Sequence, residues 1–150
     1  IPGLTVTTDL IAGFPGETDA HFAETVAFAR RNRFAHMHIF PYSAREGTAA
    51  ARFAGQVPAE ERKRRVRILH ELDAELGQAV RAGFVGQVRP VLWEQPLDTP
   101  SESGLVTWVG LTDNYLRVLA TAPVGADLHN RITTTRLVGL QGNDLTGTMV

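Results

Sequence analysis

The fold is decided by the stretch DLIAGFPGET, residues 9–18, in which a short apolar run passes into a turn. The whole run, Leu4–Phe14, is nearly continuous in apolar residues, which is typical of a parallel strand buried on both faces. In the turn, Gly13 and Gly16 let the backbone approach a ligand closely, and Pro15 stiffens the chain. Because α/β sheets and barrels bind ligands at the carboxyl ends of parallel strands, this turn is the first candidate for a binding site.

A helix and a second strand are predicted after the turn. Thr18 or Asp19 suits the helix N-cap. One buried stripe at helical spacing comprises Phe22, Val26 and Ala29. The next apolar run, residues 34–42, predicts the second strand. A strand, a helix and a strand with short connections form a βαβ unit, so we expect the two strands to run parallel.

The remainder of the chain changes its pattern at about residue 84. A loop of about 17 residues comes first, and a loop of that length in a compact domain is usually functional or a linker. Pro58 then opens a long helix that ends near Gly83. From Phe84 onward, five short runs rich in Val, Leu and Thr alternate with Gly, Pro, Asp and Asn, which predicts a small antiparallel barrel. We place a domain boundary between residues 83 and 84.

Composition narrows the function classes. The chain of 150 residues has no cysteine, which excludes disulfides, thiolate metal sites and iron–sulfur ligation within this segment. No apolar run approaches the roughly 18–20 residues of a membrane span, so no membrane association is predicted. Residues 1–83 hold 11 of the 15 Lys and Arg and 10 of the 16 Asp and Glu, so residues 84–150 hold the remaining 4 and 6. The chain does not begin with Met, and we expect a segment of a larger, cytoplasmic protein.

Two patterns in the first half admit a chemical and a structural interpretation. Glu17, after the two glycines, could accept hydrogen bonds from a ribose or an amino group, or simply favour the following helix N-terminus. His36 and His38 lie two apart on one strand face, as a metal pair would. Hydrogen-bonded histidines facing a barrel lumen are the favoured interpretation, because no acid is placed to complete a site. No metal site is predicted.

Two further patterns suggest contacts with RNA. The run EERKRRVR, residues 60–67, could contact phosphates, or form a solvated face through the i, i+4 pairs Glu60–Arg64 and Glu61–Arg65. In TDNYLRV, residues 112–118, Tyr115 and Arg117 alternate onto one strand face, where they could stack on bases and hold phosphates or pack at the barrel rim. No nucleophile and base have a recognisable spacing, so no catalytic residue is assigned.

Longer stretches resemble a known enzyme family. The stretch TTDLIAGFPGETDAHFAETVAFAR, followed by HMHIFPYSAREGTAAARFAGQVP, is similar to the second half of the radical S-adenosylmethionine (SAM) barrel of methylthiotransferases. The stretches FVGQVRPVLWE, GLTDNYLRV and GTMV are similar to the TRAM domain of those enzymes. The resemblance implies an α/β C-terminal part of a TIM-like barrel with its closing helix at residues 1–83. It implies a small all-β, OB-like TRAM barrel at residues 84–150.

The resemblance also implies a reaction. Family members add a methylthio group by using SAM and two four-iron four-sulfur clusters, through a 5′-deoxyadenosyl radical. HIFPYS and LTDNYLRV are most similar to the branch that acts on N6-threonylcarbamoyladenosine beside the tRNA anticodon. Two other branches act on N6-isopentenyladenosine of tRNA and on an aspartate of a ribosomal protein. A non-catalytic RNA-binding protein, with the TRAM barrel as its working part, is a further alternative.

The family's motifs assign roles to residues of this chain. The cluster ligands are cysteines that lie outside this chain, so we expect the segment to be inactive alone and to need the missing N-terminal portion of the same polypeptide. The second partner is tRNA, at its anticodon-loop region. The residues expected to line the SAM site are Gly13, Gly16, Glu17, Phe40, Pro41 and Tyr42. The residues expected to contact tRNA are Arg45, Lys63, Arg64, Asn114, Tyr115 and Arg117.

Overall fold

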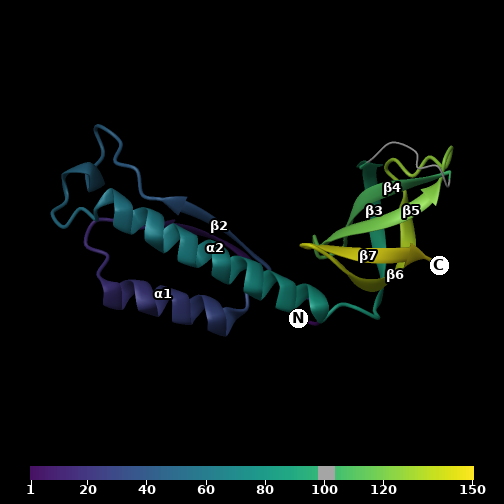
Figure 1. Cartoon of the computed structure of the whole chain (residues 1–150), viewed down its shortest axis with the longest axis horizontal. Helices are drawn as coiled ribbons and strands as arrows, with labels where there is room; N and C mark the ends of the chain where they lie inside the picture. The colour runs from purple at the N-terminus through teal and green to yellow at the C-terminus, as the bar shows by residue number, and fades with distance from the viewer. Residues whose placement is uncertain (98–103) are drawn as a thin grey trace. The chain divides into compact units, whose positions relative to one another are not determined.

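The computed structural model describes residues 1–97 and 104–150 (Figure 1). The chain forms two compact units, Val6–Gln78 and Ala79–Val150, and the first five residues, Ile1–Thr5, belong to the second unit. These units divide within one long helix, and the domain boundary expected at 83/84 stays a prediction. No helix in the described ranges is long and apolar enough to cross a membrane.

The first unit is built on a parallel βαβ arrangement. Strand β1 (Thr7–Ala12) leads through helix α1 (Asp19–Asn32) to strand β2 (His36–Pro41). The two strands pair in parallel, from Thr7 opposite His36 to Ala12 opposite Pro41, which confirms the predicted pairing. A short 3₁₀ helix, η1 (Ala50–Arg52), and the long helix α2 (Ala59–Ala82) complete the unit.

The helix boundaries follow from local chemistry. Thr18 caps α1, because its Oγ1 accepts a hydrogen bond from the backbone N–H of His21 at 3.2 Å, and the His21 ring accepts one from the Thr18 N–H in return. At the other end, Arg33 adopts a left-handed conformation with φ of 51°, and its N–H bonds to the carbonyl of Ala29. Helix α1 therefore begins and ends where short-range hydrogen bonds satisfy its free backbone groups.

One face of the β1–β2 sheet is buried and the other is exposed. The buried face shares a core with both helices, made of Ala12, Phe22, Ala29, Phe34, Met37, Ile39, Leu69, Leu72 and Leu76. On the opposite face, Ile11 is 59% exposed and its cross-strand neighbour Phe40 is 53% exposed. The prediction of a strand buried on both faces is therefore wrong for the described chain. The long helices α1 and α2 both contribute to the core on the first face.

The second unit is a closed barrel of five strands in the order β3–β4–β5–β7–β6. Its strands are β3 (Val88–Pro96), β4 (Leu105–Thr112), β5 (Arg117–Pro123), β6 (Ile132–Gln141) and β7 (Asp144–Met149). The predicted antiparallel barrel is confirmed for all neighbouring pairs except β5 and β7, which run parallel. The α/β region followed by a five-stranded barrel agrees with the fold that the resemblance implied.

The barrel interior is filled by apolar side chains around one tryptophan. Trp93 has no exposed surface, and its indole Nε1–H donates to Thr133 Oγ1 at 2.8 Å. Gly110, on the neighbouring strand, leaves the room that this ring occupies, because a Cβ there would lie 2.8 Å from Trp93 Cε3. The buried ring of Trp93 therefore requires a glycine at position 110 of the neighbouring strand.

Candidate functional site

The turn after β1 uses both of its glycines. Gly13 and Gly16 have φ angles of 76° and 86°, a left-handed region that side chains with a Cβ rarely adopt. A Cβ on Gly13 would collide with the Cγ of Arg62 from α2, whereas a Cβ on Gly16 would meet no heavy atom within 4 Å. Gly13 is therefore needed for close packing, and Gly16 for the conformation of the turn alone.

Hydrogen bonds close the turn on itself. The Gly13 N–H donates to Glu17 Oε2 at 2.5 Å, and the Glu17 N–H donates to the carbonyl oxygen of Phe14 at 2.9 Å. The Gly16 N–H donates to the carbonyl oxygen of Gly55, in the loop before α2, at 2.8 Å. The carboxylate of Glu17 thus has a partner within the chain. Its expected contact with a ligand stays a prediction.

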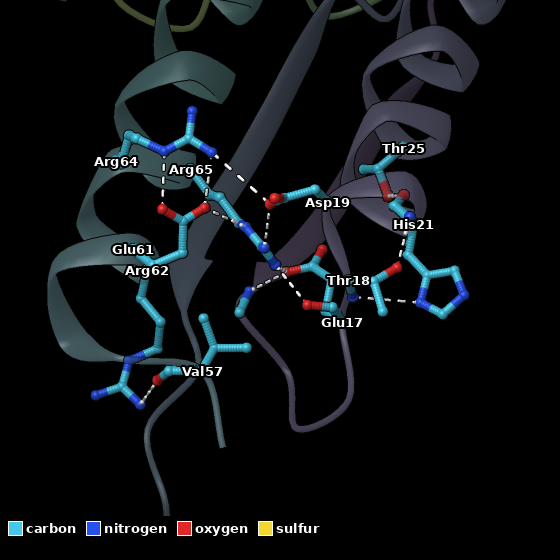
Figure 2. A network of polar contacts seen from close by, with 11 residues as sticks. Glu17, Thr18, Asp19, His21, Thr25, Val57, Glu61, Arg62, Arg64 and Arg65 are labelled. Carbon is cyan, nitrogen blue, oxygen red and sulfur yellow. Dashed lines mark hydrogen bonds and ion pairs between the residues drawn. The ribbon is translucent and has the colours of Figure 1, made fainter. Parts of the chain in front are cut away.

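Arg65 of α2 binds this turn (Figure 2). Its Nη1 donates at 2.8 Å to both Oε2 and the carbonyl oxygen of Glu17. Its Nη2 donates to Asp19 Oδ1 and its Nε to Glu61 Oε1, each at 2.9 Å. Burial lowers the pKa of the Arg65 guanidinium, but the hydrogen bonds to Glu17 and Glu61 outweigh burial and hold that pKa above its usual value. The side chain is 4% exposed and fully ion-paired.

The other cations of this basic run are exposed, except Arg62, which is half-buried. Lys63 pairs with Glu60 at 2.9 Å, and Arg64 pairs with Glu61 at 2.7 Å, so the expected Glu60–Arg64 pair is wrong, while the Glu61–Arg65 pair is confirmed. The spacing of three residues brings these side chains together as readily as a spacing of four. The hydrogen bond from Arg64, with further help from Arg65, lowers the pKa of Glu61 to about 2. Lys63 and Arg64 are thus each paired with an acid of the same helix. Their expected contact with tRNA stays a prediction.

A pocket of about 270 Å³ opens at the carboxyl ends of β1 and β2. Its aromatic wall is formed by Phe14 and Tyr42, whose rings meet edge to face at 5.2 Å between centroids. The Tyr42 hydroxyl is buried and has no hydrogen-bond partner within the described residues. The pocket is lined by Ile11, Phe14, Pro41, Tyr42, Ser43, Arg45, Thr48 and Ala50.

The structure groups some of the predicted site residues and separates others. Pro41 and Tyr42 line the pocket together with Arg45, which was expected to contact tRNA. The other residues expected at the SAM site, Gly13, Gly16, Glu17 and Phe40, lie outside the pocket lining. Phe40 is on the exposed sheet face beside Ile11. The aromatic and apolar wall suits a purine ring, and the hydroxyl groups suit a ribose. The residues that line the pocket therefore fit the adenosyl group of SAM. The chain has no cysteine to bind a cluster.

His36 is hydrogen-bonded within the first unit. His36 Nδ1 lies 3.0 Å from Asp73 Oδ2, while Asp73 Oδ1 accepts from the Met37 N–H at 2.7 Å. The rings of His36 and His38 meet edge to face with centroids 4.5 Å apart. No group of three or more potential metal ligands occurs in residues 1–97 and 104–150. The hydrogen bond of His36 agrees with the structural interpretation of these residues.

On the barrel, Asn114 lies in a tight turn before β5. Its Nδ2 donates to the carbonyl oxygen of Gly3 at 2.8 Å, its carbonyl oxygen accepts from Thr5 Oγ1 at 2.6 Å, and its Oδ1 accepts from Thr112 Oγ1 at 2.5 Å. Asn114 therefore ties the first residues of the chain to the barrel. Its expected contact with tRNA stays a prediction.

Tyr115 and Arg117 do not alternate along a strand as expected. Tyr115 has a φ of 63° in the turn, and β5 begins only at Arg117, so the regular alternation of a strand does not extend to Tyr115. Tyr115 is 84% exposed and borders a groove of about 270 Å³ together with Leu92 and Ile132. Arg117 Nε lies 3.5 Å from Asp144 Oδ2.

Sequence reasoning missed the residue that organises the turn. Arg65 is buried, although Lys63, Arg64 and Arg67 of the same basic run are exposed. It lies four positions before Leu69 and continues the buried stripe of α2 toward the N-terminus. That spacing is the sequence signal that could have identified it.

Comparison with known proteins shows similarity to methylthiotransferases, although no family model matches the chain. The chain is 39% identical over 119 residues to threonylcarbamoyladenosine tRNA methylthiotransferase MtaB of Bacillus subtilis, which is 79% of this chain and 26% of that protein. It is 48% identical over 95 residues to the ribosomal protein methylthiotransferase RimO of Gloeobacter violaceus, 63% of this chain and 22% of that protein. It is 44% identical over 99 residues to the tRNA-2-methylthio-N(6)-dimethylallyladenosine synthase of Moorella thermoacetica, 66% of this chain and 22% of that protein.

The chain therefore spans about a quarter of the length of the curated relatives it matches. Homology to methylthiotransferases is shown at identities near 40% over most of the chain. These relatives act on different acceptors by their names, and the similarity does not separate them.

Proposed function

We propose that this chain is the C-terminal part of a tRNA methylthiotransferase that adds a 2-methylthio group to N6-threonylcarbamoyladenosine beside the anticodon by radical SAM chemistry. The observation that carries the proposal is the 39% identity over 119 residues to the Bacillus enzyme named for that nucleoside. A match of 119 residues is longer than either compact unit, so it includes parts of both. A second relative named for the same nucleoside, from Thermotoga maritima, is 41% identical over 93 residues. The choice of acceptor belongs to the proposal, because relatives named for other acceptors match the chain at similar identity.

The first unit would hold SAM. Gly13, Gly16 and Glu17 would form one wall of its site, and Pro41 and Tyr42 would form another, with Phe40 at the adjoining sheet face. SAM, when bound, supplies the radical precursor and the methyl group. The residues of this chain orient the adenosyl group and exclude water from it, while the cysteines that ligate the two clusters come from the preceding part of the polypeptide.

The second unit would bind tRNA. Tyr115 presents an exposed aromatic ring, on which an unstacked base can stack, and Arg117 lies two residues further along. The other proposed contacts are Asn114 of the same unit and three cations of the first unit, Arg45, Lys63 and Arg64. The expected location of such an enzyme is the cytoplasm, where its tRNA substrate is modified.

The test is nucleoside mass spectrometry of bulk tRNA from a strain that lacks the gene. We expect 2-methylthio-N6-threonylcarbamoyladenosine to disappear and its unmethylthiolated precursor to accumulate, with recovery when the full-length gene is restored. Loss of 2-methylthio-isopentenyladenosine instead, or of a methylthio group on a ribosomal-protein aspartate, would assign one of the other acceptors. If no methylthio group is lost from either tRNA or ribosomal protein, the enzymatic proposal fails.

A non-catalytic RNA-binding protein is the second candidate, and the exposed ring of Tyr115 favours it. In this case the 150-residue chain alone should bind tRNA with an affinity that falls steeply as salt rises. Tyr115→Ala should weaken that binding about fivefold or more, because base stacking is worth about 1–3 kcal/mol. Tight, salt-dependent binding combined with unchanged methylthio nucleosides in the deletion strain would favour this candidate over the enzyme.

A further inference from the structure

Arg65 is set apart from the other cations of α2 by where its side chain ends. Its side chain is 4% exposed, whereas the side chains of Lys63 and Arg67 in the same run are 73% and 72% exposed. Its guanidinium also lies over the ring of Phe22 from α1, 5.3 Å from the ring centroid. A charged group buried to this degree is stable only when its donors are satisfied.

The partners of Arg65 fall into two kinds. Asp19 and Glu61 accept from Nη2 and Nε, and both belong to helices. Glu17 accepts twice from Nη1, through its carbonyl oxygen and through Oε2, and it belongs to the turn. The guanidinium therefore joins two helix N-termini to the glycine turn with one rigid, planar group (Figure 2).

The contact with Glu17 reaches the start of the turn. Glu17 Oε2, which accepts from Arg65, also accepts from the Gly13 N–H at 2.5 Å. The turn is thus closed between its first and last residues through one carboxylate oxygen, and that oxygen is fixed in place by Arg65. A shift of the guanidinium would move the backbone of Gly13 and with it the left-handed conformation of the turn.

We propose that Arg65 is a positioning residue for the SAM-binding turn, acting through the Glu17 carboxylate on the backbone of Gly13. This inference rests on the proposed function, because it takes the turn as one wall of the SAM site. In this arrangement Glu17 affects SAM binding because its carboxylate holds the turn in shape. Arg65 contacts no ligand and is not a catalytic residue.

The test separates the two kinds of partner in the full-length enzyme. SAM binding is measured by equilibrium dialysis, and thermal stability is measured on the same samples. Glu17→Gln and Arg65→Lys alter the turn contact, since a lysine ammonium cannot serve all the acceptors of a planar guanidinium. Asp19→Asn and Glu61→Gln alter only the helix contacts. Arg67→Met, an exposed cation two residues along α2, is the matched control.

We expect Glu17→Gln and Arg65→Lys to weaken SAM binding at least tenfold. Asp19→Asn, Glu61→Gln and Arg67→Met should stay within about twofold of the unmodified enzyme, even where Asp19→Asn or Glu61→Gln lowers the melting temperature as much as Glu17→Gln does. A purely structural role of Arg65 would make the loss of SAM affinity follow the loss of stability in every variant.

The outcomes are distinguishable. If the unmodified enzyme binds SAM but Glu17→Gln and Arg65→Lys, both folded, bind it within twofold as well, the inference is overturned and the proposed function stands. If Arg65→Lys does not fold, Glu17→Gln decides alone. If the unmodified full-length enzyme does not bind SAM, the proposed function fails and the inference fails with it.

Discussion

Arg65 Nη1 donates two hydrogen bonds to Glu17, one to the carbonyl oxygen and one to Oε2, each at 2.8 Å. The two residues are 48 positions apart in the sequence, one in a turn and the other in the second turn of a long helix. The pair places a buried positive charge against Glu17, the last residue of the glycine turn that follows β1. The turn is therefore held by side-chain chemistry as well as by its own glycines.

The two glycines of the turn predict different costs on substitution. Gly13→Ala should lower the free energy of unfolding more than Gly16→Ala, by about 1 kcal/mol or more. Both substitutions cost about 1–2 kcal/mol, because a residue with a Cβ must then adopt a left-handed backbone conformation. Only the Cβ added at position 13 also collides with Arg62. The measurement is denaturant unfolding followed by far-ultraviolet circular dichroism, which reports on the helices of the first unit.

A double variant serves as the control for this comparison. Gly13→Ala combined with Arg62→Ala removes the collision with Cγ and Cδ and leaves only the Cβ of residue 62, at 3.2 Å. Its cost beyond that of Arg62→Ala alone should therefore fall close to the level of Gly16→Ala. Equal destabilisation by the two single glycine variants would contradict the packing that the structure shows at Gly13.

The pairing of Glu61 predicts a pH dependence of stability. Its pKa falls from 4.5 to about 2, so the folded state favours the carboxylate. The stabilisation is present above about pH 4.5 and is lost as the pH falls toward 2. Unfolding curves of the unmodified chain and of Glu61→Gln should therefore converge across this range. A difference in stability between the unmodified chain and Glu61→Gln that stays constant from about pH 5 to about pH 2 would contradict the pairing.

The barrel offers a sharp test at Gly110. A Cβ there would lie 2.5 Å from the carbonyl oxygen of Leu92 and 2.8 Å from Trp93, and the backbone oxygen cannot move aside. We expect Gly110→Ala to lower the free energy of unfolding by about 3 kcal/mol. The measurement is denaturant unfolding monitored by the fluorescence of the barrel tryptophans. Gly139→Ala, which meets only the side chain of Thr146 at 3.3 Å, should cost less than about 1 kcal/mol. Equal costs would show that the strand pairing differs from the one described.

The elements of the fold could be predicted because their signals are local. The apolar run before Gly13, the helical stripe through Phe22, and the regular turns after Phe84 each depend on neighbours within a few positions. The parallel pairing of β1 and β2 followed from the short connections of a βαβ unit. The parallel contact of β5 with β7 was not predicted, because strand order in a barrel is decided by contacts distant in the sequence.

The candidate site was predicted only in outline for the same reason. The two glycines indicated the turn. The burial of Arg65, however, depends on Glu17 and Asp19, which are 48 and 46 positions away in the sequence. Tyr115 was assigned to a strand because its neighbours are β-formers, whereas its left-handed conformation follows from the hydrogen bonds of the surrounding turn. The exposure of Ile11 and Phe40 depends on which layers cover the sheet, and no local pattern reports that.

The central claim is that this chain belongs to an enzyme that adds a methylthio group to threonylcarbamoyladenosine in tRNA. The most direct measurement is anaerobic reconstitution of the full-length polypeptide with iron, sulfide and SAM. With dithionite as the reductant that supplies electrons to the cluster, it is then incubated separately with each acceptor. The acceptors are tRNA bearing threonylcarbamoyladenosine, tRNA bearing isopentenyladenosine, and the ribosomal protein, and products are analysed by mass spectrometry. We predict 2-methylthio-threonylcarbamoyladenosine from the first acceptor only. Methylthio transfer to another acceptor, or to none by a cluster-loaded enzyme that binds SAM, would contradict the account.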